Sequence, residues 1–522
     1  MDKKIAILIV GLVGVLLLAQ AYSMKTKQVE LRDMYYVHEI GKDGVPLHVG
    51  EVVKVRGIVV APPGIFYKAI YIYDPSVGRG VQVFGADLTG IVNIGDYVEV
   101  TGKISQYKGE TEIVISSTTN VTVISSGHNF KAERIYTDNA YDEVYEGSFV
   151  EVCGRVESVS TSYFYLNDSS GRIQIYAPNL NIGWVQVGMN LSVTGIVAQY
   201  DTSLPYFSYY EIKPRFQSDI KNVSAISIKV SMSPSVPAAN ERAIISANIT
   251  SPVTEVYLNY TTDNWENFTR IAMTYNSSTS EWEAEIPGEP EGTLVRYVVE
   301  AKDNSGLWNS SIERKYYVGS VGIDIGRKAP QYTRLRIYGN VTAKPGDFSP
   351  TNMYIQNSSY GIKVISGSLP ALNYGDYVEV VGYVKHSRTN DVYVVAIYTI
   401  NESSGNPVQP IPMSVAEANT TNYGALVEVE GTIVAMDSYG FNISDGQGNV
   451  LRIYNASHSQ IPWLSVGKKV KVVGIQSQYY ETHEVMIRSA SDVTEVVIEI
   501  NPIVLFSLVA AIIGGMRLYA EK

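Results

Sequence analysis

The chain has 522 residues, of which 45% are hydrophobic, and a formal net charge of −11. This length exceeds what one hydrophobic core supports and predicts about three to five domains. Cys153 is the single cysteine, which excludes an intrachain disulfide, and the acidic balance argues against a strongly basic nucleic-acid-binding surface. The 39 tyrosines, against 11 phenylalanines and 5 tryptophans, favour an all-β protein.

The N-terminal segment 1–23 has the pattern of a signal peptide or of an uncleaved signal anchor. Lys3 and Lys4 precede an apolar run from Ile5 to Ala19, and Ala19-Gln20-Ala21 fits a small-residue cleavage signal. The run is short for a membrane span of about 20 residues. This favours the cleaved signal peptide and leaves the signal anchor as the alternative.

Four segments share the pattern G-x-x-V/L-x-V-x-G and begin at Gly95, Gly188, Gly375 and Gly467. Their period-two apolar spacing predicts a strand with one buried face. Each is preceded by a similar strand that ends at Gly57, Gly154, Gly339 or Gly431, and then by a hairpin with an Asp or Asn followed by Gly. We therefore expect four small β units, at 30–126, 127–225, 320–405 and 406–497.

Residues 226–319 follow a different pattern and are expected to form a separate domain. Val256 to Tyr260, Trp282 to Pro287 and Val298 to Gly306 alternate apolar and polar residues between turn signals. Several short strands at regular spacing predict a β-sandwich.

The C-terminal segment 500–519 predicts a short transmembrane helix. Pro502 to Met516 is apolar, and Arg517 and Lys522 would lie in the cytoplasm by the positive-inside rule. The alternative is a buried core helix. With either N-terminal interpretation, the bulk of the chain would be extracellular and held on the cell membrane by a single pass, or by two passes if the N-terminal segment is retained.

Glycosylation sequons support the extracellular placement, because they occur more often than chance predicts. The candidates are Asn120, Asn190, Asn248, Asn259, Asn267, Asn276, Asn309, Asn340, Asn357, Asn401, Asn419 and Asn455, and the pattern also occurs at Asn167, Asn222 and Asn442. Accidental matches on a surface rich in Ser and Thr are the alternative. Many sequons with one cysteine favour an archaeal source.

The strand–hairpin–strand units resemble the secreted OB-fold modules appended to extracellular nucleases. The segment from Tyr145 to Gly154 matches the entry pattern Y-x-G-x-x-V-x-V-x-G, and Tyr423 to Gly431 matches it with one residue fewer. The 226–319 segment is similar to fibronectin-III and immunoglobulin-like modules. The resemblance implies an all-β fold with four OB barrels in tandem and one sandwich between the second and third.

Catalytic and metal-binding patterns are missing from the sequence. His38, His48, His128, His386, His458 and His483 form no H-E-x-x-H pair, and no P-loop or G-x-S-x-G occurs. Asp74, Asp168 and Asp445 recur in the hairpins, where turn chemistry accounts for them. We expect no enzyme activity, no cofactor and no metal.

Strand parity points Tyr71, Tyr165 and Tyr354 outward beside Gln82, Gln174 and Lys363, on the face where OB folds stack bases or sugars. Only the third unit carries more basic than acidic residues. Its candidate contacts are Arg334, Arg336, Tyr338, Lys363, Lys385 and Arg388. A tyrosine-rich strand surface and a solvated basic face are the alternatives without a ligand.

These patterns favour a non-catalytic protein of the cell surface that binds single-stranded DNA or RNA. The alternative is a structural or adhesive envelope protein that binds glycans, envelope proteins or copies of itself.

Overall fold

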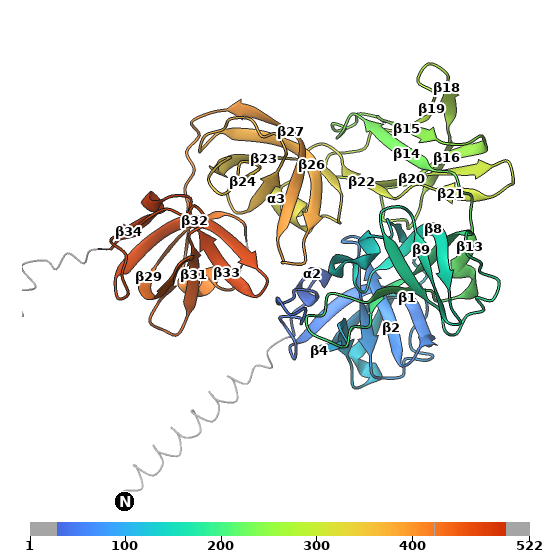
Figure 1. Cartoon of the computed structure of the whole chain (residues 1–522), viewed down its shortest axis with the longest axis horizontal. Coiled ribbons are helices and arrows are strands. Elements are labelled where there is room, and N and C mark those ends of the chain that lie inside the picture. The colour runs from blue at the N-terminus through green and yellow to red at the C-terminus, as the bar shows by residue number, and fades with distance from the viewer. Residues whose placement is uncertain (1–28, 422, 497–522) are drawn as a thin grey trace, which may run out of the picture. The chain divides into compact units, whose positions relative to one another are not determined.

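The computed structural model describes residues 29–421 and 423–496, and these consist mostly of strands and turns (Figure 1). The chain divides into two compact units. The first comprises Met1–Val321, Ile325–Arg336 and Val381–Val392, and the second comprises Gly322–Asp324, Ile337–Val380 and Tyr393–Lys522. The segments 1–23 and 500–519, expected to be a signal sequence and a transmembrane helix, lie outside the described residues. Among the residues described, no helix has the length and apolarity to cross a membrane.

Barrel 1 belongs to the first unit and is a closed sheet with the strand order β1-β2-β3-β5-β4. Pairing of β1 with β4 closes it, from Val52 opposite Lys103 to Ile58 opposite Tyr97. Its strands are β1 (Val52–Phe66), β2 (Ala69–Asp74), β3 (Arg79–Phe84), β4 (Tyr97–Tyr107) and β5 (Glu110–Val114), with β6 (Val121–Ser125) added at the edge of β4. Inside it, alternate residues such as Val98 and Val100 form the core.

Barrel 2 repeats this arrangement, with the order β8-β9-β10-β12-β11 closed between β8 and β11. Its strands are β7 (Glu133–Arg134), β8 (Phe149–Val159), β9 (Tyr163–Asn167), β10 (Arg172–Tyr176), β11 (Asn190–Gln199), β12 (Tyr210–Lys213) and β13 (Ile220–Asn222). Its core contains Phe164, Leu166, Ile173 and Ile175, on one side of the β9–β10 hairpin. The tyrosines and glutamines between them therefore point out of the barrel.

A two-layer sandwich also belongs to the first unit. One sheet has the order β14-β15-β19-β18, and the other contains β17-β16-β20-β22, with β21 beside β20. The strands are β14 (Ile228–Ser233), β15 (Ala243–Ile249), β16 (Val253–Thr261), β17 (Thr269–Ala272), β18 (Thr274–Asn276), β19 (Glu281–Ile286), β20 (Leu294–Asp303), β21 (Trp308–Ser310) and β22 (Arg314–Tyr317). Residues of both sheets form one core, as in a β-sandwich.

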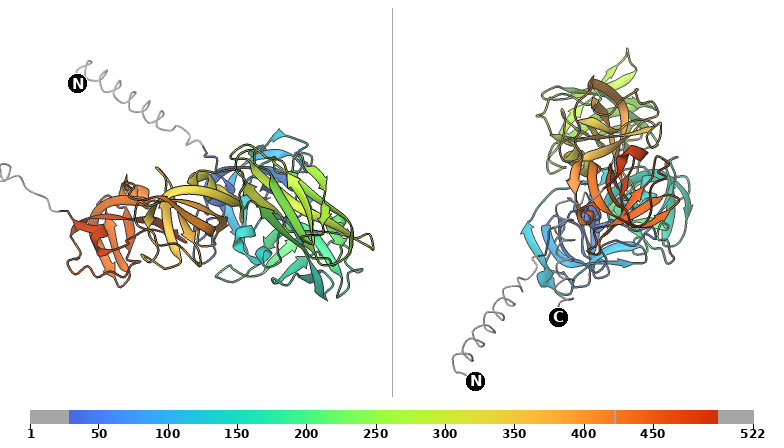
Figure 2. Two further views of the ribbon diagram at one scale, coloured as in Figure 1. Left: turned by 90° about the horizontal axis from the view of Figure 1, so that it is seen from above. Right: turned by 90° about the vertical axis from the view of Figure 1, so that its left-hand side faces the viewer.

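Buried charged side chains hold the sandwich against barrels 1 and 2, whose strands lie beside it in Figures 1 and 2. Arg296 contacts Glu313 at 2.9 Å and also donates to the carbonyl of Pro75 in barrel 1. Lys315 pairs with Glu133 of barrel 2. Because all four charged side chains are buried, removing one partner would leave an uncompensated charge.

Barrels 3 and 4 show the same closed strand order, with closing pairs β23–β26 and β29–β32. Barrel 3 contains β23 (Arg334–Ala343), β24 (Asn352–Gln356), β25 (Gly361–Ile365), β26 (Tyr377–His386) and β27 (Val392–Ser403). Barrel 4 contains β28 (Ile411–Met413), β29 (Leu426–Asp437), β30 (Gly440–Ser444), β31 (Val450–Tyr454), β32 (Lys469–Tyr479), β33 (Thr482–Met486) and β34 (Val493–Glu495). The boundary between the two units passes through β23 and β26.

Helices are short in the described residues and lie in the segments between strands or before the first strand. They are α2 (Met34–Val37), α3 (Ile323–Lys328) and α4 (Val415–Ala418), with the 3-10 turns η1 (Thr118–Asn120), η2 (Asn139–Tyr141), η3 (Glu143–Tyr145), η4 (Gln217–Asp219) and η5 (Ala490–Asp492). The predicted all-β class, with several closed barrels, is thereby confirmed.

Barrels 1 and 2 pack together through contacts that recur between barrels 3 and 4. Arg215 donates to the Val60 carbonyl at 2.6 Å, and Arg488 donates to the Thr342 carbonyl at 2.7 Å. Each arginine also forms a two-bond pair with the aspartate four residues later. The two-barrel pair is therefore the repeating unit of the fold.

Two glycines bring the paired barrels into backbone contact. A Cβ on Gly80 would lie 2.5 Å from the Gly147 carbonyl oxygen, and a Cβ on Gly361 would lie 2.1 Å from that of Gly424. No side chain fits at either position, so glycine is required for this approach.

Candidate functional site

Two of the tyrosines predicted to form a stacking surface are covered. Tyr71 and Tyr354 do point out of their barrels, but Tyr71 is 0% exposed and Tyr354 is 5% exposed. Each contributes to the apolar contact with the next barrel of its pair, and a phenylalanine, Phe66 or Phe348, meets it edge-on. The expectation of exposed rings at these two positions is wrong, because the outer face of one barrel is the packing face of the pair.

A cleft of about 1300 Å³ lies where barrels 1 and 2 meet, within the first unit. Tyrosine dominates its lining. The most exposed rings are Tyr67 at 79%, Tyr209 at 65%, Tyr107 at 60%, Tyr200 at 50% and Tyr141 at 44%. Exposed aromatic rings around a concave surface are typical of a binding site for a molecule with flat apolar faces.

A Tyr-Gln-Glu ladder crosses three adjacent strands on the cleft side of barrel 1. Tyr71 of β2 stands opposite Gln82 of β3, which stands opposite Glu112 of β5. Gln82 Nε2 donates to the Tyr71 hydroxyl at 2.7 Å, and that hydroxyl donates to Glu110 at 2.5 Å. The ladder places amide and carboxylate groups in the wall of the cleft.

The same ladder occurs in barrel 2 and lines the same cleft. Tyr165 of β9 stands opposite Gln174 of β10, which stands opposite Glu211 of β12. Tyr165 donates to Gln174 at 3.0 Å, and Gln174 donates to Glu211 at 2.8 Å. Tyr165 is only half-buried, and the Arg172 guanidinium lies 4.8 Å from its ring centroid. Of the three predicted tyrosines, Tyr165 alone keeps an accessible ring.

Acidic and basic side chains both line the cleft, with Glu110, Glu112 and Glu211 in the same lining as Arg172, Lys213 and Arg215. Burial raises the pKa of the Glu112 carboxyl, against the hydrogen bond from Ser105. Burial also raises the pKa of Glu211, which the charge of Lys213 opposes. Lys213 lies 3.5 Å from Glu110 and 3.8 Å from Glu211, so its charge is already shared between two carboxylates.

One exposed lysine contacts two tyrosines on opposite sides of the cleft. The Lys108 ammonium lies 4.2 Å from the ring centroid of Tyr200 and 5.4 Å from that of Tyr107, and it donates to the Tyr200 hydroxyl. This hydrogen bond is the main cause that raises the pKa of Lys108. The lysine therefore holds the two rings near each other at the edge of the cleft.

The basic residues predicted for the third unit are divided between the two compact units. Arg334, Arg336, Lys385 and Arg388 belong to the first unit, whereas Lys363 belongs to the second. Arg336 donates to the Val236 carbonyl at 3.2 Å.

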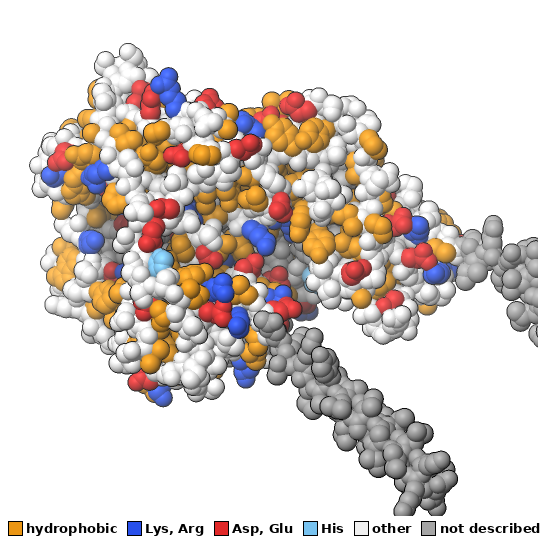
Figure 3. All heavy atoms as spheres, turned by 180° about the vertical axis from the view of Figure 1, so that it is seen from behind, with side chains coloured by type: hydrophobic (Ala, Val, Ile, Leu, Met, Phe, Trp, Pro, Cys, Tyr) orange, Lys and Arg blue, Asp and Glu red, His pale blue; other side chains and the backbone are white. Residues whose placement is uncertain are grey.

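Three of the basic side chains in this predicted set lie over aromatic rings. Lys385 lies over Tyr332, Arg388 over Phe207, and Lys363 over Tyr393. Tyr338 stacks on Tyr377 at 5.9 Å and donates to Glu379. On the face of the molecule shown in Figure 3, acidic and basic side chains are interspersed and form no basic stripe.

One predicted glycosylation site does not fit the folded chain. Asn259 of β16 is 3% exposed, and its strand has neighbours on both sides, β17 and β20. A glycan on its side chain would have no route to solvent. The sequon at this position is therefore excluded as an acceptor in this fold.

The sequence interpretation missed the glutamates of the ladders and the tyrosines around the cleft. A repeated Glu-Ile pair at Glu112-Ile113 and Glu211-Ile212 was available as a signal, because it marks the same strand of both barrels. The exposed tyrosines had no such signal, since they lie in loops and at strand ends whose meeting depends on the packing of the two barrels.

No protein-family model matches the chain, and no curated protein matches it significantly in sequence. Among solved structures, a cycloalternan-degrading enzyme from Trueperella pyogenes is 15% identical over 25% of this chain and 16% of that enzyme, with a TM-score of 0.17. The tetrameric p202 HIN2 is 12% identical over 35% of this chain and 98% of its own, with a TM-score of 0.21. A murine DNA-binding protein bound with double-stranded DNA is 10% identical over 33% and 97%, also with a TM-score of 0.21. At such TM-scores these likenesses carry no argument about the ligand.

Proposed function

We propose that the protein is a non-catalytic binding protein that holds an oligosaccharide chain in the cleft between barrels 1 and 2. The observation that carries this proposal is the pair of Tyr-Gln-Glu ladders that line one cleft surrounded by exposed tyrosines. The sequon excess and the apolar ends of the chain support a location outside the cell, attached to the membrane.

The chemistry of a sugar ring matches this lining. One face of a pyranose presents C–H groups, which pack on aromatic rings, and its edge presents hydroxyls that both donate and accept hydrogen bonds. The exposed tyrosines offer the rings. The carboxylates and amides of the ladders offer acceptors and donors at fixed positions, and OB barrels are known to bind oligosaccharides on this face.

Single-stranded nucleic acid, the ligand favoured by the sequence, is the second candidate. Arg172 beside the half-buried ring of Tyr165 and Lys108 beside the exposed ring of Tyr200 favour it, since bases also stack on tyrosine. A phosphate chain would, however, approach Glu110, Glu112 and Glu211. Phosphate binding needs free cations and is weakened by like charge, so the cleft favours an uncharged chain.

Binding of neutral oligosaccharides and of a labelled single-stranded oligonucleotide should be compared at low and at high salt. We expect affinity for a neutral glycan that changes little with salt. Binding of only the oligonucleotide, with affinity that falls steeply as salt rises, would replace the glycan with nucleic acid. Binding of neither ligand would refute the cleft as a site for either class.

The chain offers a matched pair of tyrosines for testing the site itself. Tyr107 and Tyr479 each end the strand that closes a barrel, β4 or β32, and both are 60% exposed, but only Tyr107 lines the cleft. Tyr107→Ala should weaken ligand binding by about 1 kcal/mol or more, which is roughly fivefold, because a stacked ring is lost. Tyr479→Ala should leave the affinity unchanged.

A further inference from the structure

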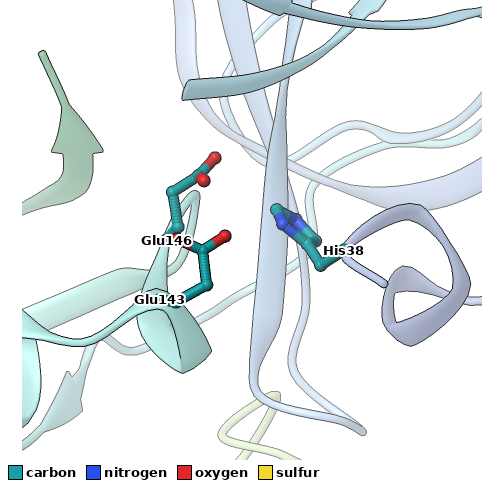
Figure 4. Close-up of side chains that lie close together, drawn as sticks. All are labelled: His38, Glu143 and Glu146. Atoms are coloured by element: carbon teal, nitrogen blue, oxygen red, sulfur yellow. The ribbon is translucent and has the colours of Figure 1, made fainter. Parts of the chain in front are cut away.

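Three buried side chains from distant parts of the sequence converge beneath the cleft. His38 follows helix α2, Glu143 begins the turn η3, and Glu146 caps that turn before β8. Figure 4 shows the two glutamates on one side and the imidazole on the other. One ligand atom from each lies within 4.8 Å of the other two, and the three residues are 4%, 5% and 0% exposed.

A second observation points to a ligand. Among the described residues, no N–H or O–H donor reaches the buried atoms His38 Nδ1, Glu143 Oε1 and Glu146 Oε2, and a hydrogen bond between the two carboxyl groups would need a proton on one of them. Such atoms are rare in folded proteins, because each one loses its water without replacement. Here three of them belong to the same cluster.

The other polar atom of each side chain is already satisfied, and this fixes its orientation. His38 Nε2 lies 2.8 Å from the Gly80 carbonyl, which can only accept, so Nε2 carries the proton and Nδ1 keeps its lone pair. Glu143 Oε2 accepts from the Tyr210 hydroxyl at 2.5 Å, and Glu146 Oε1 accepts from the Thr111 backbone N–H at 2.7 Å. Metal-binding histidines and carboxylates have outer partners of this kind.

Charge also favours a cation at this position. Two carboxylates are buried side by side within the cluster. Glu110 adds a further negative charge to the surroundings of Glu146, and Arg79 is the nearby positive charge acting on Glu143 and His38. A divalent cation would neutralise the remaining negative charge without protonating either carboxylate.

We infer that His38, Glu143 and Glu146 bind a divalent metal ion, with Zn²⁺ as the ion that the donor set fits best. One imidazole nitrogen and two carboxylate oxygens are common ligands of Zn²⁺, at distances of about 2.1 Å. A tetrahedral site with these bonds separates its donors by about 3.4 Å. Small side-chain rotations from the present spacing would reach that geometry.

The position of the site gives the ion a structural role. The ion would join His38, which follows helix α2, to the turn η3, which leads into barrel 2. The Gly80 carbonyl beside His38 links the site to β3 of barrel 1. When the second barrel pair is aligned with the first by matching Gly431 to Gly154, Thr420 and Tyr423 stand at the positions of Glu143 and Glu146. The carboxylates are therefore not a requirement of barrel packing, and the site is specific to the pair that forms the cleft.

Metal content and stability of the full chain test the inference together. After treatment with a chelator and dialysis, the chain should bind one equivalent of Zn²⁺, and the ion should raise the melting temperature of the first unit. Co²⁺ should substitute and give the absorption of a tetrahedral site. Glu146→Gln and His38→Gln should each abolish stoichiometric binding, whereas Glu484→Gln, which removes a carboxylate from barrel 4, should not.

The alternative is a cluster held by a shared proton, in which one glutamic acid donates to its neighbour. In that case the wild-type chain would bind no stoichiometric Zn²⁺, the chelator would not change its melting temperature, and Glu146→Gln would stabilise it. Binding that persists in both Glu146→Gln and His38→Gln would also overturn the assignment. Measurement on the wild-type chain keeps the test decisive even if a variant fails to fold.

Discussion

Replacing Arg215 with methionine tests whether a buried arginine holds each barrel pair together. The guanidinium makes two hydrogen bonds of 3.0 Å to Asp219 and one of 2.6 Å to the Val60 carbonyl, and both charged side chains are 9% exposed. Methionine keeps an apolar side chain but loses the guanidinium, which lies 4.2 Å from the Phe149 ring centroid. The Val60 carbonyl then loses this donor, and Asp219 loses its ion-pair partner.

The expected loss of stability is worked from these contacts. Removing one partner of a buried ion pair costs about 3–5 kcal/mol. Asp219 keeps two backbone N–H donors, from Arg215 and Phe216, so the lower end applies, about 3 kcal/mol. At about 2 °C per kcal/mol for a domain of this size, the melting temperature of the first unit should fall by roughly 6 °C.

Calorimetry would measure the fall in melting temperature. Hydrogen exchange of the peptides that contain β8 and β11 would show where in the chain the loss occurs. Arg488→Met should produce the same effect in the second unit, because its contacts to Asp492 and Thr342 are equivalent. A loss below about 1 kcal/mol would show that solvent screens the pair. If Arg215→Met lowered the hydrogen-exchange protection of β29 and β32 as much as that of β8 and β11, the organisation into two barrel pairs would be refuted.

Two further predictions concern backbone approach and pH. Gly80→Ala should loosen the packing of barrels 1 and 2, because its Cβ would lie 2.5 Å from the Gly147 carbonyl oxygen and 2.6 Å from that of Ile72. Gly367→Ala should be neutral, because its Cβ would meet no atom within 4 Å. The rates of proteolysis of the two variants should be compared. Burial raises the pKa of Glu484 from 4.5 to about 7, against the charge of Arg452. The folded state then holds a proton that the unfolded chain releases, so the stability of the second unit should fall by about 2–3 kcal/mol from pH 4.5 to pH 7 and stay low above it. Denaturant unfolding of Glu484→Gln should show a flatter pH profile, and an unchanged profile would contradict the assignment.

Strand positions and barrel interiors could be predicted from the sequence because they depend on local patterns. Alternation such as Val98 and Val100 puts every second side chain into a core, and the Asp or Asn with Gly between two such runs predicts the hairpin. The same reasoning placed Tyr71, Tyr165 and Tyr354 outside their barrels, and all three are there.

Only the tertiary structure decided which outward side chains reach solvent. Packing of one barrel on the next buries Tyr71 and Tyr354, yet the same packing leaves a cleft in which Tyr165 remains accessible. It also brings His38 to Glu143 and Glu146, which no spacing rule connects. Period-two alternation says which side of a strand a residue occupies, but it contains no information about the neighbour that covers that side. Binding groups in this protein are set by contacts between barrels, and those contacts exist only once the barrels have folded and met.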